Sequence, residues 1–139
     1  MLPDHYVSST EERLSLYQKL AEISNAFDLT AFENELKDRF GELPDEAINL
    51  LKSVELKWLA AEIGFDKLVV KNKVFLGYFP ANPQDKFYQS EKFKKIIAYL
   101  TQNPKEATLK EKNNQLMMRK DHVKNVDEVN LVLNRILSH

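Results

Sequence analysis

Cysteine is absent from the 139 residues of this sequence, and glycine occurs only three times. The lack of cysteine excludes a disulfide framework and any metal site built on thiolates, and it suits the reducing cytoplasm, where we expect the protein to function. A phosphate-binding loop needs several glycines close together, because the backbone amides must approach the ligand. The glycines are far apart, at Gly41, Gly64 and Gly77. We therefore expect no nucleotide site and no cofactor.

Long apolar runs are also absent. The longest, such as residues 68–70 and 74–76, have the length of strands, whereas a membrane helix needs roughly 18 or more apolar residues. The first residues contain no basic run followed by an apolar stretch, so we expect no signal peptide. Hydrophobic residues make up 43% of the chain and charged residues 29%, which is ordinary globular composition. We expect a soluble protein with no membrane partner, folded as one domain over residues 1–139.

Groups that could perform catalysis are sparse. The histidines are isolated from one another, at His5, His122 and His139. None has a second ligand at metal-binding spacing, and no serine or aspartate around them suggests a nucleophile. The adjacent carboxylate pairs fall in first helical turns, where capping and the helix dipole explain them. We expect neither a catalytic residue nor a metal site in this chain.

The net charge of −1 hides an uneven distribution. Residues 1–64 hold 13 acidic and 6 basic side chains, whereas residues 65–139 hold 8 acidic and 14 basic. The net charges of −7 and +6 describe a dipolar chain that could orient a charged partner. The simpler interpretation is that each half has its own balance of charge on solvated faces.

Three helices are predicted in the first half. Ser9 and Glu12 form a capping-box pattern that starts the first helix, and Asn25 and Asp28 interrupt the apolar periodicity after it. A second capping box, residues 30–33, predicts a short helix that ends at a glycine.

The third helix is predicted to be the longest. It starts with Pro44 in its first turn, where the missing N–H costs nothing, and it ends at Gly64. Its expected inward residues recur at steps of three and four: Ala47, Leu51, Val54, Trp58 and Ala61. Residues 1–64 therefore form a helical part.

The second half, residues 65–139, changes to a period of two. Residues 67–71 and 74–79 flank Asn72-Lys73 and predict a hairpin, and residues 107–111 and 115–120 predict another around the turn 112–114.

Each hairpin is followed by a predicted helix. The first spans residues 90–102, with Phe93, Ile96, Ile97 and Leu100 inward, and the second begins at Asn125. The element order is ααα-ββ-α-ββ-α, and antiparallel hairpins beside helices define an α+β fold.

Two basic clusters could bind nucleic acid. Lys92, Lys94 and Lys95 surround Phe93, and lysines beside an aromatic ring can hold phosphate and stack a base. Phe93 falls on the inward face of its helix, so we expect it in the core. The second cluster runs from Arg119 through Lys124, and a solvated basic surface explains it slightly better than nucleic-acid binding does.

Three segments of the first half carry a resemblance to a known family. Residues 38–45 read Asp-Arg-Phe-Gly-Glu-Leu-Pro-Asp, which resembles the DRFG-x-LP-D signature of the C-terminal domain of bacterial transcription-repair coupling factors, the Mfd family. Residues 2–7 resemble the (I/L)-P-x-x-Y-(I/V) opening of that domain. Residues 13–21 resemble its RL-x-x-Y-(K/R)-x-(L/I)-A first helix, and the spacing between the segments also fits.

This resemblance implies that the chain is part of a larger protein, so that Met1 is not a natural start. The full-length family member is an ATP-dependent DNA translocase that removes stalled RNA polymerase and recruits UvrA. Its C-terminal domain is regarded as regulatory: it packs on an N-terminal UvrB-like module, hides the UvrA-binding surface and restrains translocation. The expected partners are therefore the UvrB-like module, with UvrA, RNA polymerase and DNA reached through the parent protein.

Within the signature we expect two kinds of residue. Phe40, Gly41, Leu43 and Pro44 fit a fold-defining role, as a core residue, a helix C-cap and the start of the next helix. The charged pair Asp38 and Arg39 are the candidates for interdomain contacts. Two alternatives remain for the whole chain: a stand-alone adaptor that binds a protein, and a weak nucleic-acid-binding module.

Overall fold

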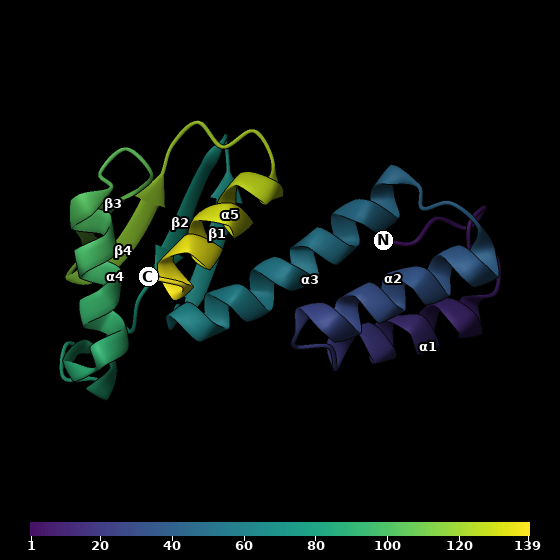
Figure 1. The fold of residues 1–139 in the computed structure, drawn as a ribbon, viewed down its shortest axis with the longest axis horizontal. Helices are drawn as coiled ribbons and strands as arrows, with labels where there is room; N and C mark the ends of the chain where they lie inside the picture. The colour runs from purple at the N-terminus through teal and green to yellow at the C-terminus, as the bar shows by residue number, and fades with distance from the viewer. The chain divides into compact units, whose positions relative to one another are not determined.

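The computed structural model describes every residue from Met1 to His139. Its elements are α1 (Thr10–Ala21), α2 (Ala26–Phe40), α3 (Asp45–Ile63), β1 (Lys67–Lys71), β2 (Val74–Tyr78), the 3-10 helix η1 (Lys86–Gln89), α4 (Glu91–Gln102), β3 (Thr108–Lys112), β4 (Gln115–Lys120) and α5 (Val126–Leu137) (Figure 1). The predicted α+β fold and its element order are confirmed, with η1 as an addition. None of the helices combines the length and the apolar character that crossing a membrane would require.

The chain divides into two compact units, Met1–Trp58 and Leu59–His139, so that the division falls within α3. We call these the helical unit and the sheet unit. The assignment of residues 1–139 to a single regulatory domain stays a prediction.

Four of the helices start at a serine or asparagine N-cap. In each case the cap side chain accepts a hydrogen bond from the backbone N–H three residues later, at Ser9, Asn25, Ser90 and Asn125. This contact satisfies one of the N–H groups that the first helical turn leaves without a partner. The predicted starts of α1, α4 and α5 are therefore confirmed.

The predicted start of α2 is wrong. The helix begins at Ala26 rather than near Thr30, because the Asn25 side chain accepts from the Asp28 N–H at 2.8 Å. Asn25 and Asp28 were expected to break the helical pattern, yet both residues are favoured in a first turn, as a cap and as a charge at the positive end of the helix dipole. Thr30 consequently lies inside the helix.

The predicted bounds of α3 are nearly correct, but its inward face is not. Ala47 and Leu51 are buried in the helical unit, whereas the buried residues beyond Trp58 are Leu59, Ala60 and Ile63, and Ala61 is exposed. A single stripe was extrapolated along the whole helix. Because the two ends of α3 contribute to the cores of different units, the buried face changes along its length.

The core of the helical unit joins α1, α2 and the first part of α3 to the segment before α1. Its buried residues are Leu2, Val7, Leu16, Leu20, Phe32, Leu36, Ala47 and Leu51. Because each of the three helices presents only one apolar stripe, burial depends on their packing together rather than on helix propensity.

The sheet unit contains one four-stranded antiparallel sheet in the order β1-β2-β4-β3. Both hairpins close through two residues with positive φ, Asn72-Lys73 and Asn113-Asn114, at 54° and 62° in each pair. Positive φ at both central positions suits the twist of the flanking strands, and asparagine tolerates it. The second turn was predicted to include Lys112, but that residue is the last of β3 and pairs with Gln115.

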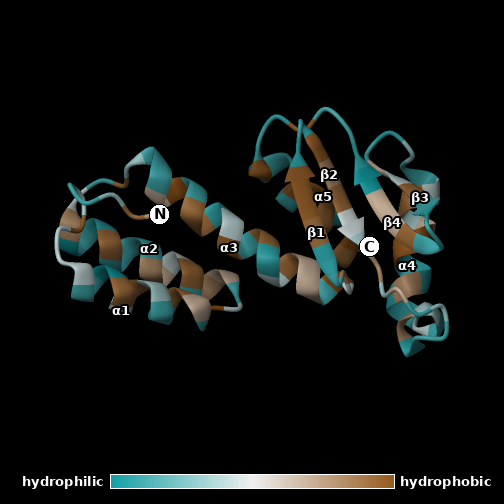
Figure 2. Cartoon of the chain, turned by 180° about the vertical axis from the view of Figure 1, so that it is seen from behind, coloured by the Kyte–Doolittle hydropathy of each residue, from teal (hydrophilic) through white to brown (hydrophobic).

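Helices α4 and α5 cover one face of this sheet and leave the opposite face without a helix (Figures 1 and 2). The covered face carries Phe75 and Gly77. A Cβ at Gly77 would lie 2.5 Å from the Phe65 ring, so only glycine allows that aromatic ring to pack there. Phe79 extends this core, with its ring centroid 5.8 Å from that of Phe93 in α4. The predicted inward position of Phe93 is therefore confirmed.

One inward residue of α4 was misassigned. Ile97 is 36% exposed, whereas Tyr99 is buried and donates a hydrogen bond to Glu106, which also pairs with Arg135 of α5. Burial alone would raise the pKa of Glu106, but the hydrogen bonds from Tyr99 and Arg135 and the charges of Arg135 and Lys120 together hold that pKa below its usual value. These contacts tie α4 and α5 to the segment before β3.

Candidate docking surface at the α2–α3 corner

The signature residues form the connection between α2 and α3, and we call residues 38–46 the α2–α3 corner. Gly41 caps α2 with φ 89° and ψ −166°, and its N–H donates to the Lys37 carbonyl at 3.0 Å. No atom lies within 4 Å of a Cβ built at this position. The backbone conformation, rather than a lack of space, therefore explains the glycine.

Tyr6 connects the opening segment to this corner. Its hydroxyl donates to the Gly41 carbonyl at 2.8 Å and also lies 3.2 Å from the Leu36 carbonyl. Its ring contacts Phe40 at a centroid distance of 5.8 Å. Burial of the phenol raises the pKa of Tyr6 above its ordinary value. The hydroxyl thus gives a partner to the Gly41 carbonyl, which lies beyond the last helical turn of α2.

The third motif segment, in α1, holds the other side of the opening segment. The Tyr17 hydroxyl accepts from the Leu2 N–H at 2.5 Å, and Arg13 donates to the Val7 carbonyl at 2.6 Å. Arg13 also forms an ion pair with Asp4 at 3.0 Å. The three segments that share the family patterns are therefore neighbours in space, joined by contacts between side chains and backbone.

The four residues expected to define the fold lie in positions that suit that role. Phe40 and Leu43 are partly buried against the core of the helical unit. The Pro44 carbonyl accepts from the N–H groups of Ala47 and Ile48 at 3.0 and 3.1 Å, so this proline precedes α3 rather than occupying its first turn. Their fold-defining role stays a prediction that substitution can test.

Asp38 and Arg39 are placed differently from each other. The Arg39 guanidinium forms an ion pair with Glu12 of α1 and lies 4.9 Å from the centroid of the Phe40 ring. Glu12 was expected to complete the capping box at Ser9, but its carboxylate is directed to Arg39 instead. Asp38 is exposed and pairs with no residue of the chain. Of the two predicted interdomain contacts, Asp38 is the one with unused bonding capacity.

The surface of the corner is acidic. The exposed carboxylates are Asp38, Glu42, Asp45 and Glu46. The one basic side chain among residues 38–46, Arg39, is neutralised by Glu12. Such a surface suits docking against a basic partner and offers no nucleophile or base beside a cavity.

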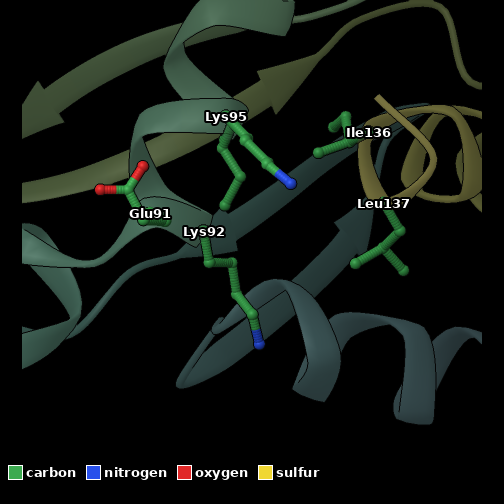
Figure 3. A pocket seen from close by; sticks show the side chains of 6 residues that line it. Glu91, Lys92, Lys95, Ile136 and Leu137 are labelled. Atoms are coloured by element: carbon green, nitrogen blue, oxygen red, sulfur yellow. The ribbon is translucent and has the colours of Figure 1, made fainter.

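A metal centre and a small-molecule cavity are the other kinds of site that the chain could hold. No group of three or more histidine, aspartate and glutamate side chains is arranged to hold a metal ion. A shallow cavity of about 220 Å³ between α4 and α5 is lined by Ile96, Ile136 and Leu137 together with Glu91, Lys92 and Lys95 (Figure 3). The Lys95 amine points towards Leu137, while the Glu91 carboxylate points away from it (Figure 3). This cavity is smaller than typical ligand pockets, which have volumes of roughly 300–1,000 Å³.

Neither predicted basic cluster forms a single binding surface. Phe93 belongs to the core, where its ring also lies 5.1 Å from that of Tyr88, so it cannot stack a base. Arg119 and Lys120 are adjacent in β4, and alternation along a strand turns their side chains to opposite faces. Arg119 pairs with Asp121 at 2.8 Å. The prediction from linear sequence missed basic residues that come together only across strands, since strand pairing is not visible in the order of residues.

Comparison with known proteins agrees with the motif pattern and the fold. The family model described as the TRCF domain matches residues 1–90. The chain belongs to the TRCF domain family, which forms the C-terminal domain of transcription-repair coupling factors. The crystal structure of the C-terminal domain of a transcription-repair coupling factor superimposes with a TM-score of 0.81 at 20% identity, covering 99% of this chain and 86% of that one. This likeness extends the shared fold through β3, β4 and α5.

Several full-length relatives bear the same description. The transcription-repair-coupling factor of Rickettsia conorii is 30% identical over 126 residues, which cover 90% of this chain and 10% of that protein. The protein of the same name from Escherichia coli K12 is 38% identical over 68 residues, which cover 49% of this chain and 6% of the relative. The chain thus spans about a tenth of the length of the Rickettsia relative.

Proposed function

We propose that this chain is a non-catalytic regulatory domain of an ATP-dependent DNA translocase that couples transcription to nucleotide excision repair. In this proposal it docks on the UvrB-like module of its own parent protein, masks the UvrA-binding surface and restrains translocation until RNA polymerase is engaged. The membership of the chain in the TRCF domain family supports the assignment of this parent protein. The chain contributes no phosphate loop of its own, since its glycines are far apart in sequence.

The observation that carries the docking proposal is the acidic α2–α3 corner. Its backbone is held by Tyr6 and Gly41, while Asp38 and the neighbouring carboxylates have no partner within the chain. A backbone that is already fixed in one conformation loses less entropy on binding. Carboxylates without a partner in the chain make the surface electrostatically complementary to a basic surface. A domain that binds only the closed state of its parent stabilises that state by its docking free energy.

The test compares the full-length protein with and without the residues equivalent to 1–139. We expect deletion to raise UvrA affinity and DNA translocation, because the closed state loses the contact that stabilises it. Equal UvrA affinity and equal translocation in the two forms would leave the regulatory proposal without support.

A second comparison assigns the effect to the corner. In the full-length protein, Asp38→Asn with Glu42→Gln should partly reproduce the deletion. The matched control, Glu11→Gln with Glu22→Gln, removes the same charge from exposed positions of the helical unit outside the corner. If both double variants raise UvrA affinity and DNA translocation equally, the net charge of the domain rather than the corner is responsible for docking.

A further inference from the structure

The sheet of this protein has one face without a helix, and its composition differs from that of the other face. The buried residues Phe75 and Gly77 belong to the helix-covered face, so alternation places Val74, Leu76 and Tyr78 on the opposite side. We call that side the outer sheet face. Figure 2 views the sheet unit from this side, with both helices behind the strands.

Strand register gives the other residues of the outer sheet face, because directly paired residues share a face. One row across the sheet reads Lys67, Tyr78, Met117 and Lys110, and the next reads Val69, Leu76, Arg119 and Thr108. The pairs Lys71–Val74 and Lys112–Gln115 complete the face at the hairpin ends.

The charges on this face all have one sign. Its basic residues are exposed and come from three strands: Lys67, Lys71, Lys110, Lys112 and Arg119. None of its strand positions is acidic. Asp121, which follows β4, forms an ion pair with Arg119 at 2.8 Å, whereas the amines of Lys71, Lys110 and Lys112 form no ion pair or side-chain hydrogen bond within the chain. A solvated sheet normally mixes both signs, so this arrangement favours an anionic ligand.

The centre of the face is apolar and lies between two basic edges. Lys67 and Lys110 are three strands apart, which corresponds to roughly 14 Å. Between them lie Tyr78, which is half-buried, and Met117, which is buried. The Lys67 amine lies 5.7 Å from the centroid of the Tyr78 ring. Unpaired nucleotides offer a row of phosphates and exposed bases. Lysines at the edges of an open sheet can contact the phosphates, and an aromatic ring between them can stack a base.

We propose that the outer sheet face binds single-stranded nucleic acid, with the lysines contacting phosphates and Tyr78 stacking a base. A duplex keeps its bases stacked inside, so it would use the lysines and leave the apolar centre without a partner. An acidic polypeptide would use the same charges and offers no base to stack. This proposal concerns the sheet unit and does not depend on the docking of the α2–α3 corner.

The experiment measures binding of the 139-residue chain to a fluorescent 20-nucleotide oligothymidine by anisotropy over a salt series. A 20-base-pair duplex and poly-L-glutamate serve as comparison ligands. We expect the single strand to bind most tightly. Lys67→Ala with Lys110→Ala should reduce the slope of log affinity against log salt by about 1.4, since each phosphate contact contributes about 0.7 for single strands. Tyr78→Ala should weaken binding at least about fivefold at constant salt.

A matched control removes the same charge from the helix-covered side. Lys92→Ala with Lys95→Ala changes two lysines of α4 beside the cavity described above. This double variant should keep the slope of log affinity against log salt, and Tyr78→Ala should weaken its binding as much as it weakens binding of the original chain. Circular dichroism and the thermal midpoint establish that each variant is folded. The proposal is overturned if folded Lys67/Lys110 and control variants lose binding equally, if the duplex or polyglutamate binds as tightly as the single strand, or if nothing binds at low salt.

Discussion

Gly41 shows how one residue can be required by backbone geometry alone. Its φ of 89° combined with ψ of −166° lies in a region that is essentially restricted to glycine. The surrounding space is open, so a larger side chain there meets no atom and any cost arises from the backbone. The sequence predicted the cap, since glycine after an apolar helical stretch is a common stop signal.

We predict that Gly41→Val destabilises the helical unit by about 1–3 kcal/mol, because valine cannot adopt this conformation without strain. Urea denaturation followed by the helical circular dichroism signal measures the change. Ala31→Val is a suitable control: it introduces the same side chain at an exposed position of α2 and should cost only about 0.7 kcal/mol through helix propensity. A denaturation midpoint for Gly41→Val no lower than that of the control would refute the cap assignment.

Tyr6 illustrates what a residue-level analysis of sequence cannot give. Its position in the opening pattern was visible, but its partners, the carbonyls of Leu36 and Gly41, are 30 and 35 residues away. Such a contact depends on how helices pack. Similarly, the ion pair between Arg39 and Glu12 joins α2 to α1, and neither local pattern indicates it.

At the scale of elements, capping chemistry decides where helices begin. Asn25 and Thr30 both fit an N-cap, and the structure selects Asn25 because its side chain reaches the Asp28 N–H. Phe27 follows this cap and is 82% exposed, so apolar periodicity gave no indication that the first turn was helical. Two cap signals therefore competed at this boundary, and the structure rather than the sequence selected Asn25.

We predict that Asn25→Ala lowers the free energy of unfolding of the helical unit by about 1 kcal/mol, since the first turn loses its cap. Thr30→Ala provides the comparison. Thr30 lies inside the helix and is exposed, so alanine there should be neutral or slightly stabilising through its higher helix propensity. Chemical denaturation of the two variants distinguishes the assignments, and a larger loss for Thr30→Ala would place the start of the helix at residue 30 after all.

The presence of both hairpins was predictable because their signals are local, although the second turn was predicted one residue too long. Two-residue turns rich in asparagine, between strands of alternating character, specify both the turn and the register. The pairing of β2 with β4 is different, since it joins two hairpins separated by η1 and α4. That pairing forms the rows of the outer sheet face, which is why its basic residues were not recognised as one surface.

On the scale of the whole molecule, charge is separated between the two units. Residues 1–58 hold 12 acidic and 6 basic side chains, and residues 59–139 hold 9 acidic and 14 basic. The unequal charge matches the two proposals, in which the acidic corner docks on a basic protein surface and the basic sheet face binds a polyanion.

If charge contributes to docking, salt should partly reproduce deletion of the domain in the parent protein. We expect the ratio of UvrA affinity between the deleted and intact forms to fall towards one as ionic strength rises from about 0.05 to 0.3 M, because exposed pairs are screened beyond about 10 Å at 0.1 M. Using the ratio cancels the salt dependence of UvrA binding itself. A large ratio that does not change with salt would show that docking is mainly apolar.

The sequence by itself determined the features that depend on a few neighbouring residues. These are the helix caps at Ser9 and Asn125, the glycine stop at Gly41, the two asparagine-containing turns and the order of elements, because each arises from local backbone chemistry. Only the tertiary structure decided which distant segments meet. It brought the opening segment, α1 and the α2–α3 corner together through Tyr6, Tyr17 and Arg13, changed the buried face of α3 between the two units, and aligned lysines from separate strands, because packing and strand pairing join residues that no local pattern connects.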